Sequence, residues 1–462
     1  MLIGPDSVES RRMPIDLTTA LRLTQSRAID VQVAAERTRL AQAQLQKARV
    51  AWLPNIIWGY DYARHDGRIQ DIVGNALNTN RSSVLWGYGP TAEVSTSDAL
   101  FAPLAARQVV QARLAGERVA SNDTTLAVAE AYFGVQQARG ELAGAVESAR
   151  LAEDLVRRAE KLAAGLAQPV EVNRARAELA RRRQAVELAQ ERWQTESAEL
   201  ARLLRLDPLT VVEPVEPPQL RLEFFDSSIP VDSLVPIGLM NRPELAAQQA
   251  LVKATLARLR QERLRPLMPS VLLRGNATNP AGTFSGGSFA AGTNGNLSDF
   301  GGRYSFDLQL VWELENLGLG NRAATRERQS ENRLAMLELF RVQDRIAAEI
   351  VQAHAQADRS ARRAQLAEDG LKDAIESVAK NLEGLSQTRR IGDVLVLVFR
   401  PQEVVAAVQA LDQAYRDYYG AVADANRAQV RLYRALGCPA ESIGSGDATP
   451  SGPPAFTPPP GR

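Results

Sequence analysis

The sequence predicts a mainly α-helical protein with a β-barrel portion, in which long antiparallel coiled-coil helices and a few short strands form two tandem repeats. Three patterns support this fold class. Proline-free stretches carry an apolar or small residue at every seventh position, other stretches alternate apolar with polar residues, and both recur in the same order in each half of the chain.

The longest helix is indicated by residues 104–166, which contain no proline and are rich in Ala, Gln, Glu, Arg and Leu. One row repeats every seventh residue, and a second row, almost all alanine, follows three residues after each member. This is the pattern of a coiled-coil seam whose small side chains let the partner helix approach closely. The first row is Val128, Val135, Leu142, Ala149, Val156 and Ala163, and the second is Ala131, Ala138, Ala145, Ala152, Ala159 and Leu166.

The second half of the chain repeats this seam. Val128 corresponds to Ile350 at an offset of 222 positions, and the same offset carries Glu171 to Asp393, so both long helices are expected to break at equivalent places. A further helix is expected over 404–436. Its unbroken alanine row is Ala407, Ala414, Ala421, Ala428 and Ala435.

Strands are indicated where the period changes to two. In residues 304–313 one face is aromatic and aliphatic while the other is mostly polar, with Val311 as the exception. A sheet over a soluble core could alternate in this way, but aromatic residues near the ends of such strands are typical of a membrane barrel, whose polar face would line a lumen. The candidate membrane-interface aromatics are Trp58, Tyr60, Trp86, Tyr88, Tyr304 and Trp312.

Membrane crossing by helices is disfavoured because the chain has no run of about 18 apolar residues. Four strands cannot close a barrel, and lipid does not tolerate unpaired strand edges. A membrane form would therefore have to oligomerise.

Composition excludes several other functions. Lys and Arg number 55 against 54 Asp and Glu, which disfavours nucleic acid as a partner. The single cysteine, Cys438, and the two histidines leave little material for a metal site. Because no nucleophile, acid pair or phosphate-binding loop stands out, we expect no catalytic residues, no metal, no cofactor and no enzymatic activity.

An alternative is a soluble coiled-coil scaffold or adaptor protein. Residues 1–14 contain acidic and basic residues but no apolar stretch, so they do not have the character of a secretory signal. That observation favours the soluble alternative, whereas the alternating strands oppose it.

Over residues 15–437 the order of several short motifs resembles the TolC-like outer-membrane efflux protein family. Each motif is weak alone, but their order and duplication are specific. They are Ile15-Asp16-Leu17-Thr18-Thr19-Ala20-Leu21, Trp52-Leu53-Pro54-Asn55-Ile56, Asn241-Arg242-Pro243-Glu244-Leu245, Leu267-Met268-Pro269-Ser270-Val271 and Leu432-Tyr433-Arg434-Ala435-Leu436-Gly437.

This resemblance implies a homotrimer in the outer membrane that extends into the periplasm. Each chain would give four strands to a 12-stranded β-barrel and its long helices to an α-helical tunnel. The implied function is that of a passive exit duct in a tripartite efflux or secretion system. The implied partners are outer-membrane lipid, a periplasmic adaptor (membrane fusion protein) and an inner-membrane pump.

The expected organisation follows the duplication. Each repeat would hold a helix, a strand pair and a long helical hairpin. The segments are an N-terminal segment 1–14, a first repeat 15–206 with strands within 54–98 and a helical hairpin 101–206, a proline-rich linker 207–240, a second repeat 241–437 with strands within 269–313 and a hairpin 321–437, and a disordered tail 438–462.

The resemblance also implies a gate at the periplasmic helix tips, 165–172 and 384–394. Asp393 matches an acidic family residue, Arg389 a basic one four positions earlier, and Glu171 occupies the equivalent acidic place in the first hairpin. Three Asp393 side chains around a threefold axis would favour cations. A plain structural role is also open, because an acidic residue early in a helix can cap amide groups and suits the helix dipole.

Two features near the second tip depart from the family. Val396 stands where a second acidic residue is expected, and Pro401 should kink or restart the helix because it removes an amide donor. Elsewhere, the run Arg181-Arg182-Arg183 is expected on a solvated helix face or at a contact with the adaptor.

Overall fold

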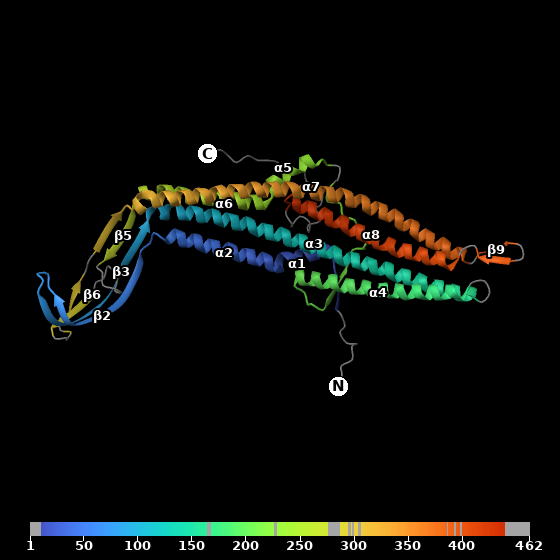
Figure 1. Cartoon of the computed structure of the whole chain (residues 1–462), viewed down its shortest axis with the longest axis horizontal. Coiled ribbons are helices and arrows are strands. Elements are labelled where there is room, and N and C mark those ends of the chain that lie inside the picture. The colour runs from blue at the N-terminus through green and yellow to red at the C-terminus, as the bar shows by residue number, and fades with distance from the viewer. Residues whose placement is uncertain are drawn as a thin grey trace, which may run out of the picture. The chain divides into compact units, whose positions relative to one another are not determined.

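The computed structural model describes residues 11–163, 168–225, 229–275, 287–293, 297, 300–303, 306–385, 387–391, 394–397 and 400–438. Tyr304 and Asp393 lie outside these residues, as do residues 1–10 of the expected N-terminal segment and 439–462 of the expected tail. The described part is mainly helical with a smaller sheet portion, which confirms the predicted fold class (Figure 1).

The chain forms two compact units from interleaved stretches, one made of Met1–Ala34, Glu117–Pro243 and Gln343–Arg462, and the other of Ala35–Gly116 and Glu244–Val342. Helices α2, α3 and α7 contribute residues to both units, as does α6 through its first residue, Pro243. Within the described ranges, no helix combines the length and the apolar content needed to span a membrane.

The second of these units holds the sheet. Its helices are most of α2 (Ile29–Val50), the first part of α3 (Thr96–Ala163), α6 (Pro243–Leu264), η1 (Arg265–Leu267), η2 (Glu315–Gly318) and the first part of α7 (Leu319–Gly384). Its strands are β2 (Asn55–Gln70), β3 (Ala76–Ser95), β5 (Ser270–Gly275), β6 (Gly287–Thr293), β7 (Phe300–Arg303) and β8 (Phe306–Val311).

Strand β3 organises this sheet. It pairs with β2 in an antiparallel hairpin from Asn55↔Thr91 to Gln70↔Ala76. Residues Arg81–Leu85 of β3 also pair with β6, and residues Ala92–Ser95 pair with β5. Strand β5 in turn pairs with β8. The two halves of the sequence therefore share one sheet, as a tandem duplication around a common β portion requires.

The first unit holds the helical hairpins. Its elements are β1 (Arg11–Ile15), α1 (Leu17–Arg27), the rest of α3, α4 (Pro169–Leu204), β4 (Thr210–Pro214), α5 (Val231–Asn241), the rest of α7, β9 (Thr388–Ile391), β10 (Val394–Leu397) and α8 (Pro401–Ala435). Figure 1 shows β9 at the end of the α7–α8 hairpin. Strands β1 and β4 of this unit pair in parallel and pack against α3 and α4.

The predicted seams are buried in this unit. Val128, Ile350 and Val404 are fully buried, and Ala138, Ala152 and Ala159 of the alanine row are at most 1% exposed. Four helices contribute to one apolar cluster, in which Leu155 of α3 and Val172 of α4 meet residues of α7 and α8. Close helix packing through small residues thus holds the two hairpins together.

A polar strap crosses this packed region. We give the name strap to residues 210–225, which lie in the proline-rich linker. Asn426 of α8 accepts a hydrogen bond from Leu222 N at 2.8 Å and donates one to Leu220 O at 2.8 Å. Gln136 of α3 donates to Pro217 O at 2.8 Å, so the strap is fixed to both helices.

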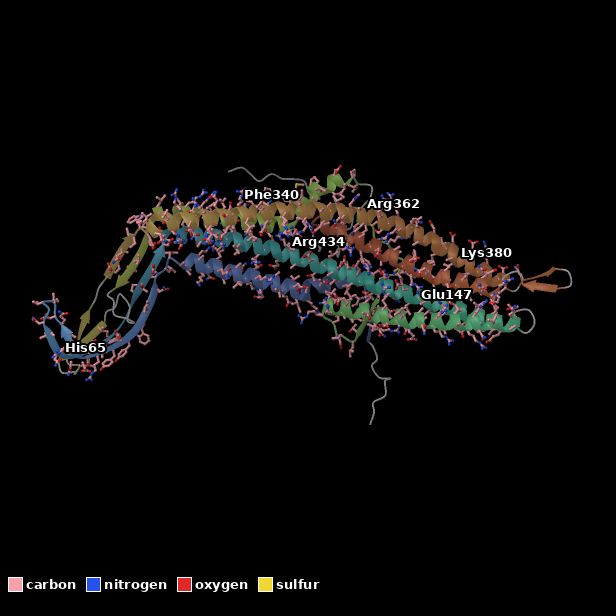
Figure 2. All side chains as sticks on the ribbon, in the orientation of Figure 1. His65, Glu147, Phe340, Arg362, Lys380 and Arg434 are labelled. Carbon is pink, nitrogen blue, oxygen red and sulfur yellow. The ribbon has the colours of Figure 1, made fainter. Side chains whose placement is uncertain are left out.

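The residues of two family-like motifs meet at the end of α8. Arg434, labelled in Figure 2, contacts Asp123 of α3 through Nε at 2.9 Å and Glu349 of α7 through Nη1 at 3.1 Å. Arg242, whose side chain is 2% exposed, contacts the same Glu349 carboxylate. The motifs 241–245 and 432–437 are therefore a single structural contact, in which two arginines share one carboxylate.

The second helical tip differs from the expected one. Helix α7 ends at Gly384, but α8 resumes only at Pro401, and the hairpin β9–β10 lies between them. The expectation that the helix resumes near Val394 is wrong, whereas the expectation that Pro401 restarts a helix is confirmed. The physical reason is that the β-branched run after Asp393 favours a strand, and proline suits the first helical position, where no amide donor is needed.

Candidate functional site

Glu171 lies in the first turn of α4, which begins at Pro169 with Gln168 as its N-cap residue. Its Oε1 accepts a hydrogen bond from Arg174 Nη1 at 2.7 Å, while its buried Oε2 has no hydrogen-bond partner. Its position in the first turn suits the helix dipole. The N-cap residue makes no side-chain capping bond, so the local role of Glu171 is to hold Arg174.

Arg174 connects the two helical tips. The nitrogen that holds Glu171 also lies 3.4 Å from Oε1 of Gln402, in the first turn of α8. Since 3.4 Å is long for a hydrogen bond, this contact is weak. Among the described residues, Arg174 therefore adds a polar contact between the tip of the first hairpin and the start of α8, beside the apolar contact of Val172 with the cluster that contains Val404.

Arg389 lies in β9, and its direct partner across the hairpin is Val396 of β10. Val396, which stands where a second acidic residue was expected, is therefore the backbone partner of Arg389 in this hairpin. Asp393 lies between the two strands, outside the described residues, and eight positions before α8 begins at Pro401.

The candidate interface aromatics form opposed pairs on the β2–β3 hairpin. Trp58 pairs with Tyr88, and Tyr60 pairs with Trp86. Trp58 is 79% exposed and Trp86 50% exposed, although the hairpin's strands are fully paired with each other. For Tyr88 only the backbone is described.

The other face of the same hairpin is mostly small or polar, with Leu85 as an exception. Gly59 pairs with Gly87, and Asp61 pairs with Leu85. Beyond Tyr62 the aromatic face becomes charged, since Arg64 and Asp66 follow at the same parity and form an ion pair at 2.7 Å. The apolar band of the aromatic face is therefore bounded along the strand.

Strand β8 repeats this arrangement. Leu308 opposes Leu273 of β5 and Leu310 opposes Val271, while Asp307 opposes Arg274 on the other face. On this face of β8, Phe306, Leu308 and Leu310 are all more than half exposed. Trp312, 58% exposed, directly follows the strand.

The sequence interpretation missed two groups of buried polar residues. Arg182, expected on a solvated face, has a side chain that is only 13% exposed, and it contacts acidic residues of α4 and α8. Its burial could have been recognised from the sequence, because Arg182 lies in the row three residues after the first heptad row of α4, where a charged residue is unusual. The strap contacts of Asn426 and Gln429 carried no comparable signal, because their partners are about 200 positions away in the chain.

The histidines have structural positions. His354 Nε2 lies 3.0 Å from Ile229 O, and His65 opposes Arg81 in the β2–β3 hairpin (Figure 2). Within the described ranges, no three His, Cys, Asp or Glu side chains gather in a way that could hold a metal ion.

Comparison with known proteins gives one family and a set of similar structures. Residues 20–204 match the family model described as "Outer membrane efflux protein". No curated protein matches the chain.

Three solved structures illustrate the likeness of fold. VceC from Vibrio cholerae is 16% identical, with a TM-score of 0.70 and coverage of 91% of this chain and 96% of that one. CmeC from Campylobacter jejuni is 15% identical, with a TM-score of 0.72 and coverage of 91% and 85%. The open state of MtrE from Neisseria gonorrhoeae is 16% identical, with a TM-score of 0.67 and coverage of 95% and 94%.

Proposed function

We propose that three copies of this chain form a passive exit channel through the outer membrane, a proposal supported by the match of residues 20–204 to the outer membrane efflux protein model. The family consists of channels rather than enzymes. The chain would act as the exit duct of a tripartite efflux or secretion system, together with a periplasmic adaptor and an inner-membrane pump.

The two-faced β2–β3 hairpin carries this proposal. The exposed side chains of Trp58, Tyr60 and Trp86 suit the lipid interface, and the glycine pair Gly59–Gly87 on the opposite face suits a lumen. In a soluble coiled-coil scaffold, tryptophan side chains as exposed as those of Trp58 (79%) and Trp86 (50%) would serve no function. Oligomerisation supplies the neighbours that a set of strands from one chain lacks.

The gate of this channel is proposed at the helix tips. Glu171 and Arg174 would hold the first tip against α8, and Asp393 and Arg389 would lie near the passage at the second tip. The contact from Arg174 to Gln402 supports this assignment, because it is a weak polar contact between the first tip and the start of α8.

The test of the channel is fractionation followed by electrical recording. We expect the protein in the outer-membrane fraction as a heat-resistant trimer that conducts ions in planar bilayers without an energy source. A matched pair of variants, Trp58→Asp on the aromatic face and Asp61→Asn on the other, should separate membrane insertion from general folding. Recovery of the parent protein as a soluble, non-conducting species would favour the scaffold instead.

A further inference from the structure

The β2–β3 hairpin extends past the other strands of its sheet. Strands β2 and β3 stay paired as far as Gln70↔Ala76, whereas β6 pairs with β3 no farther toward the turn than Arg81. Among the described residues, the last part of β2 and the first part of β3 therefore pair only with each other. We give the name ribbon to this projecting part, residues 66–80.

A network of hydrogen bonds fixes the turn at the end of the ribbon. Oδ1 of Asp71 accepts hydrogen bonds from Val73 N at 3.0 Å and from Asn75 N at 2.7 Å, and Oδ2 accepts one from Asn75 Nδ2 at 3.1 Å. Asp71 N donates to Asn75 O at 2.9 Å, and Gly74 N donates to Asp71 O at 3.1 Å. Gly74 has a φ of 99°, which favours glycine. The turn therefore has a defined shape.

The apex of this turn carries two aliphatic side chains. Ile72 is fully exposed, and Val73 is 84% exposed. Turns favour Gly, Asn, Asp, Pro and Ser, whereas β-branched residues are better suited to strands. Asp71, Gly74 and Asn75 already supply the turn chemistry, so the side chains at the apex are not needed to shape it. They are available to contact another surface.

In the proposed channel this apex lies beyond the membrane. The apolar band of the aromatic face ends at Tyr62, and the ion pair of Arg64 and Asp66 follows it on the same face. Ile72 is ten residues beyond Tyr62. At about 3.3 Å per residue, roughly 33 Å of strand separates the two, which exceeds the height of about 25 Å of the lipid-facing band of a membrane barrel. Protein is therefore better placed than lipid to cover the apex.

The hairpin is concave on its glycine face. Every partly buried position of β2 is on that face, whereas the aromatic and charged face is exposed along the whole strand. These partly buried positions are Gly59, Asp61, Gly67 and Ile69. Figure 1 shows the far end of the hairpin bending away from the direction of its first part. Because the glycine face is the one proposed for the lumen, the apex would lean over the passage rather than over lipid.

We propose that the Ile72–Val73 apices of three copies meet over the outer mouth of the channel and form an apolar constriction there. The partner of each apex is thus the same apex in a second and a third copy of this chain. The inference rests on the proposed channel function, because it needs three copies around one passage.

Charge does not oppose this contact. Within the turn, residues 71–75, Asp71 is the only ionisable residue, and its carboxylate oxygens accept hydrogen bonds from the turn itself. Apolar constrictions resist the passage of water and ions, so the contact would narrow the outer mouth. It is independent of the gate proposed at Glu171, Arg389 and Asp393, because those positions belong to the other compact unit.

The first test is disulfide cross-linking in the full-length protein, with Cys438→Ser removing the native thiol. Two cysteines form a disulfide only where their Cα atoms lie within about 7 Å of each other. After mild oxidation, Ile72→Cys should therefore give a disulfide-linked dimer as its main species, with one chain of each trimer left unlinked. The matched control is Asn78→Cys, at an exposed position on the charged face of the same ribbon. It should stay unlinked.

The second test is conductance in planar bilayers. The double variant Ile72→Asn, Val73→Ser keeps the residues that fix the turn but removes the apolar apex. Its unit conductance should exceed that of the parent by about twofold or more, because a polar mouth stays hydrated. Asn78→Ser is the matched control and should conduct as the parent does.

The outcomes separate the two proposals. A parent protein that is neither trimeric nor conducting contradicts the channel, and the constriction with it. A conducting trimer that does not cross-link through Ile72→Cys, or whose conductance is unchanged in the double variant, leaves the channel in place and overturns the constriction. Protection of the Ile72→Cys thiol from a water-soluble reagent without cross-linking would show that lipid or another protein covers the apex, which would overturn the constriction as well.

Discussion

Tyr419 of α8 lies directly against Gly140 of α3, so closely that a Cβ atom on residue 140 would come within 2.5 Å of the tyrosine ring. One turn farther along α3, a Cβ atom on Gly144 would come within 2.6 Å of Tyr415 Cβ. The rings of Tyr415 and Tyr419 are stacked, with centroids 6.3 Å apart. The two glycines therefore allow two tyrosines of α8 to pack directly against the backbone of α3.

Gly140→Ala is expected to destabilise the protein by about 1–3 kcal/mol, because the added methyl group meets an aromatic ring with no room to move aside. Gly370→Ala in α7 is the matched control. A Cβ atom there meets nothing within 4 Å, so this variant should gain about 0.5–1 kcal/mol from its lower backbone entropy. Opposite shifts of the thermal unfolding midpoint are expected, and shifts of the same sign would contradict the close contact.

Ala138→Leu should overpack the α3 seam and destabilise it by about 1–3 kcal/mol, because Ala138 is 1% exposed. Ala421 belongs to the corresponding row of α8 but is only half-buried, so Ala421→Leu should have a smaller effect. Exposed Ala143 provides the control Ala143→Leu. Denaturant unfolding of all three variants measures the order of their destabilisation. Equal unfolding midpoints would contradict the buried seam.

Leu308→Arg should cost about 2–4 kcal/mol if the apolar face of β8 lies near the middle of the membrane. Gln309→Arg places the same charge on the opposite face of the same strand and should be much milder. The measurement is the yield of folded trimer in the outer membrane together with its unfolding in lipid. Equal losses at both positions would show that neither face contacts lipid selectively.

The proposed gate is tested by Asp393→Asn and Arg389→Ser. The first should weaken cation selectivity by removing up to three charges from the passage, and the second should raise conductance by loosening the tip. Reversal potentials and unit conductances in planar bilayers measure these effects. A purely structural role for both residues predicts lower stability with unchanged selectivity and conductance.

The ionisation of Tyr433 makes the free energy of unfolding depend on pH in the alkaline range. Burial raises the pKa of Tyr433 to about 12, above the ordinary value of about 10 for an unfolded chain. The contribution of Tyr433 is present below pH 10 and is lost as the pH rises toward 12. The slope is at most about 1.4 kcal/mol per pH unit, and solvent screening at this partly exposed group reduces it. The free energy of unfolding, measured between pH 9 and 12, should therefore fall less steeply for Tyr433→Phe than for the parent.

The helical part of the fold could be predicted because its signal is repetitive. Val128, Ile350 and Val404 each begin a row of regularly spaced positions, and a row of that length specifies a buried stripe without any knowledge of the partner helix. The second tip could not be predicted in the same way. The run from Val394 to Phe399 is too short to show its own period inside a long helical context, and Pro401 alone did not reveal a strand pair before it.

The candidate site was predictable only where a residue type marks its environment. The alternating pattern predicted that Trp58 and Trp86 lie on an outer strand face, and both are exposed, while their place at a lipid interface stays a prediction. The burial of Arg182 was not predicted, because one arginine in a helix is far more often solvated than buried. Its burial depends on Asp412, which is 230 positions away, and only the folded chain brings the two together.

The strap shows how a segment can be held through its main chain as well as through its side chains. Asn426 contacts the backbone at Leu220 and Leu222, and Gln429 accepts hydrogen bonds from Phe224 N at 3.3 Å and Phe225 N at 3.2 Å. Main-chain amide and carbonyl groups are the same for almost every residue type. The polar positions of α8 should therefore tolerate almost no exchange, whereas position 220 can vary in sequence without loosening the attachment. Residue 222 is more restricted, because Leu222 also packs against an apolar cluster and proline there would remove the amide donor.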